Sequence, residues 1–275
     1  MSRFLRDFEL VIQPPGGSTV VVKPPARVVF SCDKSITGGL NRLNLQIYNR
    51  NETNRLAIVK DAEERKRIPI VLRVGYEGNV ETIFQGTIHT CSNDRRGADF
   101  VSDIEALDGG EDYLTGYTSK TVTNKQQAVD AIIESLPNTE PGKLTALKEI
   151  TRPKVLVGNP LRLLPSLLQP GETFYIDNEQ LFIVKDDEVV QTYVPLVEAR
   201  TGLLKTPQRQ AQKITFETLM NPALKLGARC DLKSVNAPYL NGVLRIESMT
   251  YSGDSEGDEW KQTVTGIAAS SFKVI

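Results

Sequence analysis

The chain is short of the residues on which most catalytic sites depend. Its 275 residues include one histidine, His89, and three cysteines far apart in sequence, Cys32, Cys91 and Cys230. A Ser-His-Asp or Cys-His arrangement would have to use His89, with Cys91 or Asp94 on ordinary strand and turn positions. Zinc requires several cysteine or histidine ligands at close spacing. We therefore expect no catalytic residue, no metal ion and no cofactor, and interpret His89 as a surface or satisfied core residue.

Signatures of phosphate and calcium binding are also missing. Neither GxGxxG nor GxxxxGK[ST] occurs in the chain. The loop of residues 254–259 carries Asp254, Glu256 and Asp258, but it lacks the register and distal glutamate of an EF-hand, so we interpret it as a solvated hairpin tip. No pair among the 34 acidic residues stands out as the carboxylate pair of a glycoside hydrolase.

Neither sign of charge is in excess. The 33 basic and 34 acidic residues give a net charge of −1, which removes the basic bias expected of a duplex nucleic-acid binder. No apolar run is long enough to span a bilayer, and Arg6, Asp7 and Glu9 interrupt the region where a signal peptide is apolar. The odd, scattered cysteines indicate reduced packing residues. We expect a protein made in a reducing cytosol, with no membrane-spanning segment.

Short β-strands are what the sequence has in abundance. In the last quarter, residues 214–267, runs of β-branched and aromatic residues are separated by Asn-Pro, Leu-Gly, Asn-Gly and the acidic loop. This pattern predicts consecutive antiparallel strands. Neither face of residues 242–251 is cleanly apolar, since Arg245 and Glu247 alternate with Leu244 and Ile246. A small barrel that buries only its inner face tolerates such an alternation.

The first hundred residues predict a similar β unit. A hairpin through Pro-Pro-Gly-Gly precedes five further strands, so the predicted strands cover residues 8–13, 18–23, 27–34, 43–48, 68–76, 80–91 and 99–107. About seven strands are enough to close a barrel. Residues 49–51 should cap a short helix over residues 52–60, with Leu56 and Val59 turned inward.

Residues 84–110 and 240–267 follow one pattern. QGTIHT corresponds to NGVLRI, and the polar stretch SNDRRGAD corresponds to SGDSEGDE. Each strand that follows begins at an aromatic residue, Phe100 or Trp260, which we interpret as core anchors. The correspondence predicts an internal duplication.

The middle of the chain has a different composition. Thr123 or Asn124 is expected to cap an amphipathic helix over residues 125–136, residues 138–151 read as a polar loop, and a hairpin is expected over residues 173–185. We predict a mainly β fold with a small α+β insert. The expected domains are a first barrel at 1–110, the α+β domain at 111–206 and a second barrel at 207–275.

Several segments resemble the baseplate hub proteins of phage tails. They are residues 27–49 followed by NETNRLA, then IVLRVGYEGNVETIFQGTI, and finally MNPALKLG with LNGVLRIESMTYSGDSEGDEW. The resemblance covers most of residues 8–107 and 213–269 and is weaker between them. It implies two tail-tube-like antiparallel β-barrel domains plus a small α+β domain, with no active site.

The resemblance also implies a structural role in the virion. Three copies would form a ring that joins a sixfold tail tube to a threefold central spike, and DNA would pass transiently through its lumen. Partners would be the tube or tube-initiator proteins and the spike, with tape measure and baseplate wedge proteins as further candidates. The protein would be assembled in the host cytoplasm and reside in the tail baseplate. Lumen-facing strand residues should be polar, as Arg245 and Glu247 are.

Two other classes of function remain open on the sequence alone. A five- or six-stranded barrel of the oligonucleotide/oligosaccharide type could bind a ligand, although aromatics are few and no basic bias exists. A cell-wall hydrolase is the third possibility, and no residue set supports it. A stable trimer would favour the hub, whereas a monomer that binds glycan or DNA would favour the binding module.

Overall fold

The computed structural model describes residues 5–15, 17–37, 39–64, 66–144, 149–150, 152–190, 193–269 and 272–274. Its helices are α1 (Glu52–Glu63), α2 (Gly110–Thr115), α3 (Lys125–Ile133) and α4 (Pro160–Leu163). Its first strands are β1 (Arg6–Ile12), β2 (Val20–Val22), β3 (Val28–Ser35), β4 (Arg42–Tyr48), β5 (Pro69–Tyr76), β6 (Asn79–Arg96) and β7 (Asp99–Leu107).

The remaining strands belong to the middle and the end of the chain. They are β8 (Thr118–Val122), β9 (Glu140–Leu144), β10 (Lys154–Gly158), β11 (Glu172–Asp177), β12 (Gln180–Lys185), β13 (Glu188–Val189), β14 (Leu196–Val197), β15 (Gln208–Gln210), β16 (Lys213–Leu219), β17 (Arg229–Leu232), β18 (Gly242–Asp254), β19 (Trp260–Ala268) and β20 (Lys273–Val274). The predicted mainly β fold with an α+β insert is confirmed.

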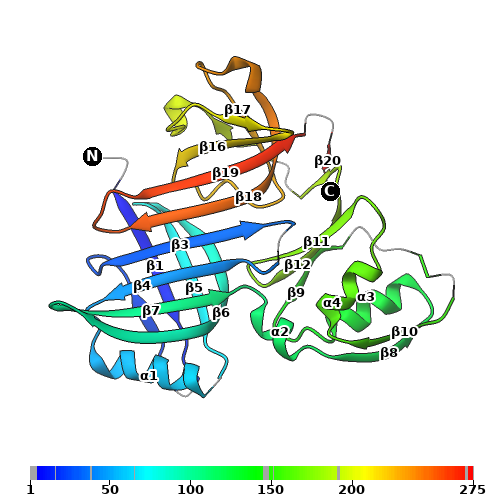
Figure 1. Ribbon diagram of the computed structural model, residues 1–275, viewed down its shortest axis with the longest axis horizontal. Helices are drawn as coiled ribbons and strands as arrows, with labels where there is room; N and C mark the ends of the chain where they lie inside the picture. The colour runs from blue at the N-terminus through cyan, green and yellow to red at the C-terminus, as the bar shows by residue number, and fades with distance from the viewer. Residues whose placement is uncertain are drawn as a thin grey trace.

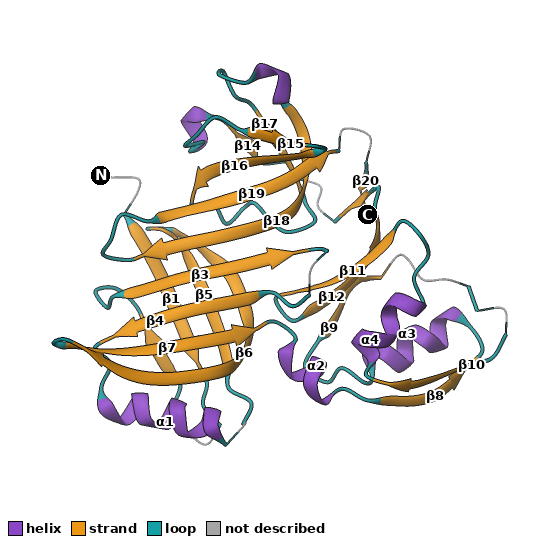
Figure 2. Ribbon diagram, viewed as in Figure 1, coloured by secondary structure: helices purple, strands orange, loops and turns teal. Residues whose placement is uncertain are grey.

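One large, mostly antiparallel sheet joins both ends of the chain. Its strand order is β15-β16-β19-β18-β3-β4-β7-β6-β5-β1-β2, and β17 pairs with β18 and β14 beside this path. Strands β16, β19, β18, β3, β4 and β7 lie one below another, while β1 and β5 cross behind them (Figure 1). Figure 2 shows α2, α3 and α4 in the insert and α1 below β6 and β7. Within the described residues, no backbone ladder closes the sheet into a barrel.

The sheet contains the same five-stranded unit twice. In the first unit the strand order is β3-β4-β7-β6-β5, and in the second it is β15-β16-β19-β18-β17. Both long hairpins carry a one-residue bulge, at His89 in β6 and at Glu247 in β18. Phe100 pairs with Arg95 in the first hairpin, and Trp260 pairs with Gly253 in the second.

The pairing registers of the two units coincide when Phe100 is superposed on Trp260. The residue paired just before the bulge is six positions beyond the aromatic residue in both hairpins, at Ala106 and at Gly266. The same superposition places Leu43 of β4 on Ile214 of β16, because Leu43 pairs with Ala106 and Ile214 pairs with Gly266. The ladders β3–β4 and β15–β16 on the other side of these strands can then be matched pair by pair. The predicted correspondence is therefore present. Strands β6 and β18, however, align two residues away from the match of QGTIHT with NGVLRI made in the sequence.

A single hydrophobic core fills the space between the sheet layers. Alternate strand residues point inward, as in β4, where Leu43, Leu45 and Ile47 are buried, so apolar side chains from both units meet in one cluster. The indole Nε1 of Trp260 donates to the carbonyl oxygen of Gly75 at 3.1 Å, which ties the start of β19 to β5. Side chains therefore hold the two layers of the curled sheet together.

Helix α1 follows β4 as predicted, but its inward face differs from the expected one. Ile58 is buried, whereas Leu56 is 56% exposed and Val59 is only half-buried. The helix extends to Glu63, and Asp61 and Ala62 in its last turn also face the core side. The spacing of apolar residues was too sparse to fix which side of the helix meets the sheet.

The insert has its own core and its own sheets. Strand β12 pairs with β11 and β9, and β8 pairs with β10. Asn124 caps α3, since its side chain accepts from the N–H of Gln127. The predicted hairpin of residues 173–185 is confirmed as β11–β12. Strand β9 was predicted as loop, because EPGKL has no strand-like composition and pairs only through β12; residues 145–148 and 151 of that predicted loop lie outside the described residues.

Candidate functional site

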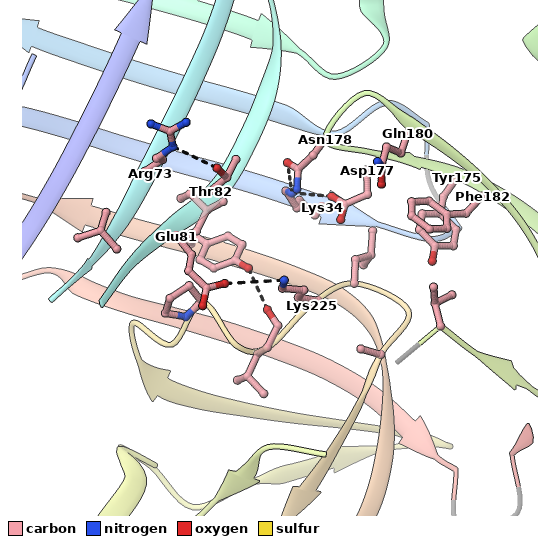
Figure 3. A pocket seen from close by; sticks show the side chains of 18 residues that line it. Lys34, Arg73, Glu81, Thr82, Tyr175, Asp177, Asn178, Gln180, Phe182 and Lys225 are labelled. Atoms are coloured by element: carbon pink, nitrogen blue, oxygen red, sulfur yellow. Dashed lines mark hydrogen bonds and ion pairs between the residues drawn. The ribbon is translucent and has the colours of Figure 1, made fainter. Parts of the chain in front are cut away.

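A cleft marks the junction of the insert with both five-stranded units. The cavity measures about 600 Å³ and is lined by side chains from the first unit, the insert and the second unit. Figure 3 shows Lys34 directed at Asp177 and Asn178, with Glu81 facing Lys225 across the cavity. The cleft is therefore the place where the position of the insert is fixed.

Lys34 and Asp177 form an ion pair in the wall of this cleft. The ammonium of Lys34 lies 2.5 Å from the Asp177 carboxylate and also donates to Asn178 at 3.0 Å. Only 4% of the Lys34 side chain is exposed. Burial lowers the pKa of this ammonium, but the nearby Asp177 charge contributes to a net increase. A buried amine kept charged in this way ties β3 to the β11–β12 turn.

Asp108 holds the same turn from the end of β7. Its carboxylate accepts from the backbone N–H groups of Asn178 and Glu179, both at 2.7 Å, and from the side chain of Asn41 at 3.1 Å. Asn178 and Glu179 both adopt positive φ, so the two amides point together at the carboxylate. Burial and then the charge of Asp177 raise the pKa of Asp108 to about 7.

Glu179 adds a further contact at the tip of this turn. Its carboxylate accepts from Arg67 at 3.1 Å and from Gln85 at 2.9 Å, and both partners belong to the first unit. A non-glycine residue at φ 59° is unfavourable on its own, and these contacts compensate for that cost. The insert is thus attached to the first unit through several charged hydrogen bonds.

A second buried ion pair lies within β18, and its arginine attaches the insert to the second unit. Arg245 lies 2.5 Å from Glu247 and donates to the carbonyl of Asp186 at 2.5 Å. Both side chains are nearly fully buried. The expectation that Arg245 and Glu247 line a lumen is therefore wrong for the described chain. Arg245 does alternate with the core residues Leu244 and Ile246, so it lies on the opposite face of β18, but the β12–β13 turn covers it there.

The outer face of the main sheet is predominantly polar. Its side chains alternate with the core residues and are exposed or half-buried; they include Ser31, Asp33, Asn44, Gln46, Thr90, Ser92, Asp103, Glu105, Thr215, Glu217, Thr250, Ser252, Thr263 and Thr265. We call this surface the polar face. Its charged members pair across strands, as Arg42 does with Glu105 at 3.1 Å.

The residues that a catalytic site would have used form no buried cluster in the described part of the chain. His89 is exposed at its bulge, Cys91 is half-buried and Asp94 is exposed. Cys32 and Cys230 are buried, and burial raises the pKa of each of these two thiols to about 12. Among the described residues, no group of three or more histidine, cysteine, aspartate or glutamate side chains is placed to hold a metal ion.

The acidic loop before β19 binds arginines. Asp254 accepts from Arg27 at 2.8 Å, and this hydrogen bond lowers the pKa of the carboxyl group. Arg6 donates to the carbonyl oxygens of Asp254, at 2.9 Å, and of Gly257. Glu256, Asp258 and Glu259 are exposed, as predicted for a solvated hairpin tip, but the base of the loop is fastened through Asp254 to the segments that precede β3. No sequence signal linked Arg6 or Arg27 to a loop more than 200 residues away.

The two aromatic residues that start β7 and β19 have different surroundings. Trp260 is buried and packs edge-on against Phe30 at 5.5 Å between ring centroids, as expected of a core anchor. Phe100 is 40% exposed and lies under the guanidinium of Arg55 at 4.2 Å. The interpretation of Phe100 as a core anchor is wrong.

Comparison with known proteins identifies the family. The family model described as "Baseplate hub gp41" matches residues 43–266, which cover most of both units and the whole insert. The chain belongs to the baseplate hub gp41 family. No curated protein matches it in sequence.

Solved structures show the same fold at low sequence identity. The prophage MuSo2 43 kDa tail protein from Shewanella oneidensis is 10% identical with a TM-score of 0.65, and the match covers 96% of this chain and 97% of that one. The Escherichia coli c3393 protein, a type VI secretion component, is 10% identical with a TM-score of 0.62, over 90% and 74%. A chain of the lidded Francisella PdpA-VgrG complex is 10% identical with a TM-score of 0.60, over 100% and 54%.

Membership of the hub family defines the class of function. The hub protein is a structural component of the phage tail baseplate, it associates with other tail components, and it is not an enzyme. No helix in the described part of the chain is long and apolar enough to cross a membrane.

Proposed function

We propose that this hub protein is a trimeric adaptor at the distal end of the tail. Three copies form a ring that joins the sixfold tail tube to the threefold central spike. The observation that carries the proposal is the five-stranded unit that occurs twice in the chain with the same strand order and register. Three chains then present six similar units, so a threefold ring offers a nearly sixfold face to a tube.

The polar face supports a place beside a DNA channel. Hydroxyl, amide and carboxylate side chains cover it. Arg42, which lies on the same surface, forms an ion pair with Glu105. Unpaired lysine or arginine side chains would hold phosphates, whereas a surface of this composition lets DNA pass without retaining it. We place the polar face toward the lumen of the ring.

The insert breaks the sixfold repeat and suits the threefold side. It occurs once per chain, and it is fixed to the first unit by the Lys34–Asp177 ion pair and to the second unit by the hydrogen bond from Arg245 to the carbonyl of Asp186. In this proposal the tube or tube-initiator proteins contact the sixfold face and the spike contacts the threefold face, with tape measure and wedge proteins nearby. We retain the division into domains at 1–110, 111–206 and 207–275, and assembly in the host cytoplasm.

Native mass spectrometry of the purified protein at micromolar concentration tests the ring. A species of three times the chain mass supports it, and so does a monomer that becomes a trimer when spike or tube protein is added. A closed dimer or tetramer would overturn the proposal. Tails made without this protein should lack the joint between tube and spike in negative-stain images.

A further inference from the structure

The second half of β6 has an edge without a strand beside it. Strand β5 pairs with β6 only up to Thr87. The last hydrogen bond on this side runs from the N–H of Ile88 to the carbonyl oxygen of Ile68. From Thr90 to Arg96, β6 pairs with β7 on one side, and no described strand pairs on the other. The N–H of Arg95 donates to the adjacent Asp94 side chain at 2.8 Å, so it points away from β7.

The equivalent edge in the second unit is occupied. There β17 pairs with the first residues of β18, and β3 takes over the same edge from Ser248 to Asp254. The pairs include Thr250 with Asp33, whose side chains also share a hydrogen bond of 2.7 Å. The joint between the two units of one chain is therefore an antiparallel ladder between the late half of β18 and β3.

The strand equivalent to β3 has a free edge as well. It is β15, the terminal strand of the sheet, which pairs only with β16 among the described residues. Its residues Gln208–Gln210 are all exposed. The registers with β4 and β16 make Gln210 the counterpart of Asp33, and Arg209 that of Cys32.

We propose that β15 of one copy pairs with the free edge of β6 in the next copy, in the register that β3 and β18 show within the chain. This inference rests on the proposed ring and specifies its contact. Transferring the register places Ser92 opposite Gln210, Asn93 opposite Arg209 and Asp94 opposite Gln208 of the neighbour. The contact joins two different surfaces, so it propagates head to tail from copy to copy, and in the proposed ring it closes after three copies.

The chemistry of the two edges fits this ladder. Position 92 faces position 210 as Thr250 faces Asp33, so a serine hydroxyl meets a glutamine amide. The counterpart of Phe30 is Pro207, which is buried as Phe30 is. Proline has no N–H, so at that pair only Arg95 donates, and the ladder loses one bond there. In the separate monomer, charges and the proline protect the two edges from other strands.

The connection between the second and third strands of the unit leaves room for this neighbour. In the first unit, the side chain of Asn93 donates to the carbonyl of Arg55 in α1 at 3.2 Å. In the second unit, the equivalent residue Tyr251 donates to the carbonyl of Leu224 at 3.3 Å, and β3 still pairs beside it. Contact with the connection and pairing along the edge are therefore compatible.

Cysteine cross-linking tests the register. In a Cys91→Ala background, Ser92→Cys combined with Gln210→Cys should give a covalent trimer on a non-reducing gel after mild oxidation. These positions form a pair of the non-hydrogen-bonded type, whose Cα atoms are about 4.5 Å apart and within disulfide reach. The protein is used as the native trimer, or within purified tails if the isolated chain is monomeric.

Two matched pairs control the geometry. Thr250→Cys with Asp33→Cys occupies the observed equivalent pair and should form a disulfide within one chain, with no covalent trimer. Arg96→Cys with Gln210→Cys is four positions out of register, about 13 Å, and should stay uncoupled. Each variant that carries only one of the introduced cysteines should remain a non-covalent assembly.

The outcomes separate this inference from the proposed ring. A trimer by native mass, with cross-linking at the predicted pair and little at the shifted pair, supports both. A native trimer that cross-links at the shifted pair, or at neither pair, overturns the strand pairing and leaves the ring intact. A closed dimer or tetramer overturns both.

Discussion

The hairpins β6–β7 and β18–β19 have the same backbone pairing, but their side chains are buried to different extents. Both carry the bulge in the same register, and both begin their second strand with an aromatic residue. In β18–β19 the tip is fastened by Arg6 and Arg27, and Trp260 is buried. In β6–β7 the tip is exposed and Phe100 lies under arginines at the surface. Strand order and register are thus shared, while burial depends on what covers each hairpin.

The bulged residues show the same contrast in charge. Glu247 is buried and paired with Arg245, which also holds the insert, whereas His89 is exposed. The insert covers the second unit at this point and leaves the first unit open. The two copies of the unit therefore differ at the bulge, where only the second unit holds the insert.

The aromatic pair should give the largest difference. Trp260→Ala removes a buried ring that contacts Phe30 and donates to Gly75, so it should lower the free energy of unfolding by about 3–5 kcal/mol. Phe100→Ala removes a ring that is 40% exposed and should cost about 1 kcal/mol or less. Chemical denaturation of both variants measures the difference. Equal losses would contradict the contrast in burial.

The sequence predicted the repeat better than it predicted what covers it. Alternation along residues 27–34 and 43–48 is a local property, and β3 and β4 follow it. Burial of Arg245 and exposure of Phe100 depend on contacts between segments far apart in sequence, which no local pattern carries. The two-residue error in matching β6 to β18 has the same origin, because Gly86 and Gly242 look equivalent as letters while the bulges fix the true register.

The bulge positions should give the next difference. Glu247→Ala leaves the buried guanidinium of Arg245 without its carboxylate, so it should cost about 3 kcal/mol. The double variant Arg245→Met with Glu247→Leu removes both charges and should recover much of this loss. Thermal unfolding and limited proteolysis of the insert report the effect. A double variant less stable than Glu247→Ala would show that the charge left unpaired is not the cause.

The attachment of the insert to the first unit should depend on pH. Burial raises the pKa of Asp108 to about 7, so the folded chain holds this proton more tightly than the unfolded chain does. Stability should therefore fall as pH rises from about 4 through 7, by about 2 kcal/mol between pH 5 and 8. In Asp108→Asn this dependence should flatten, while Asp187→Asn, at an exposed position, should keep the wild-type slope. A slope that Asp108→Asn leaves unchanged would refute this assignment.

The smallest effect is expected at His89, the exposed counterpart of Glu247. His89→Ala removes a surface side chain with no buried partner, so the free energy of unfolding should change by no more than about 0.5 kcal/mol. The chain contains no second histidine, so any histidine-dependent catalysis would have to use this residue. Assays for peptidoglycan hydrolysis and nuclease activity should give the same background for wild type and variant. A robust activity that His89→Ala abolishes would contradict the structural role, and a large loss of stability would contradict the difference between the two bulges.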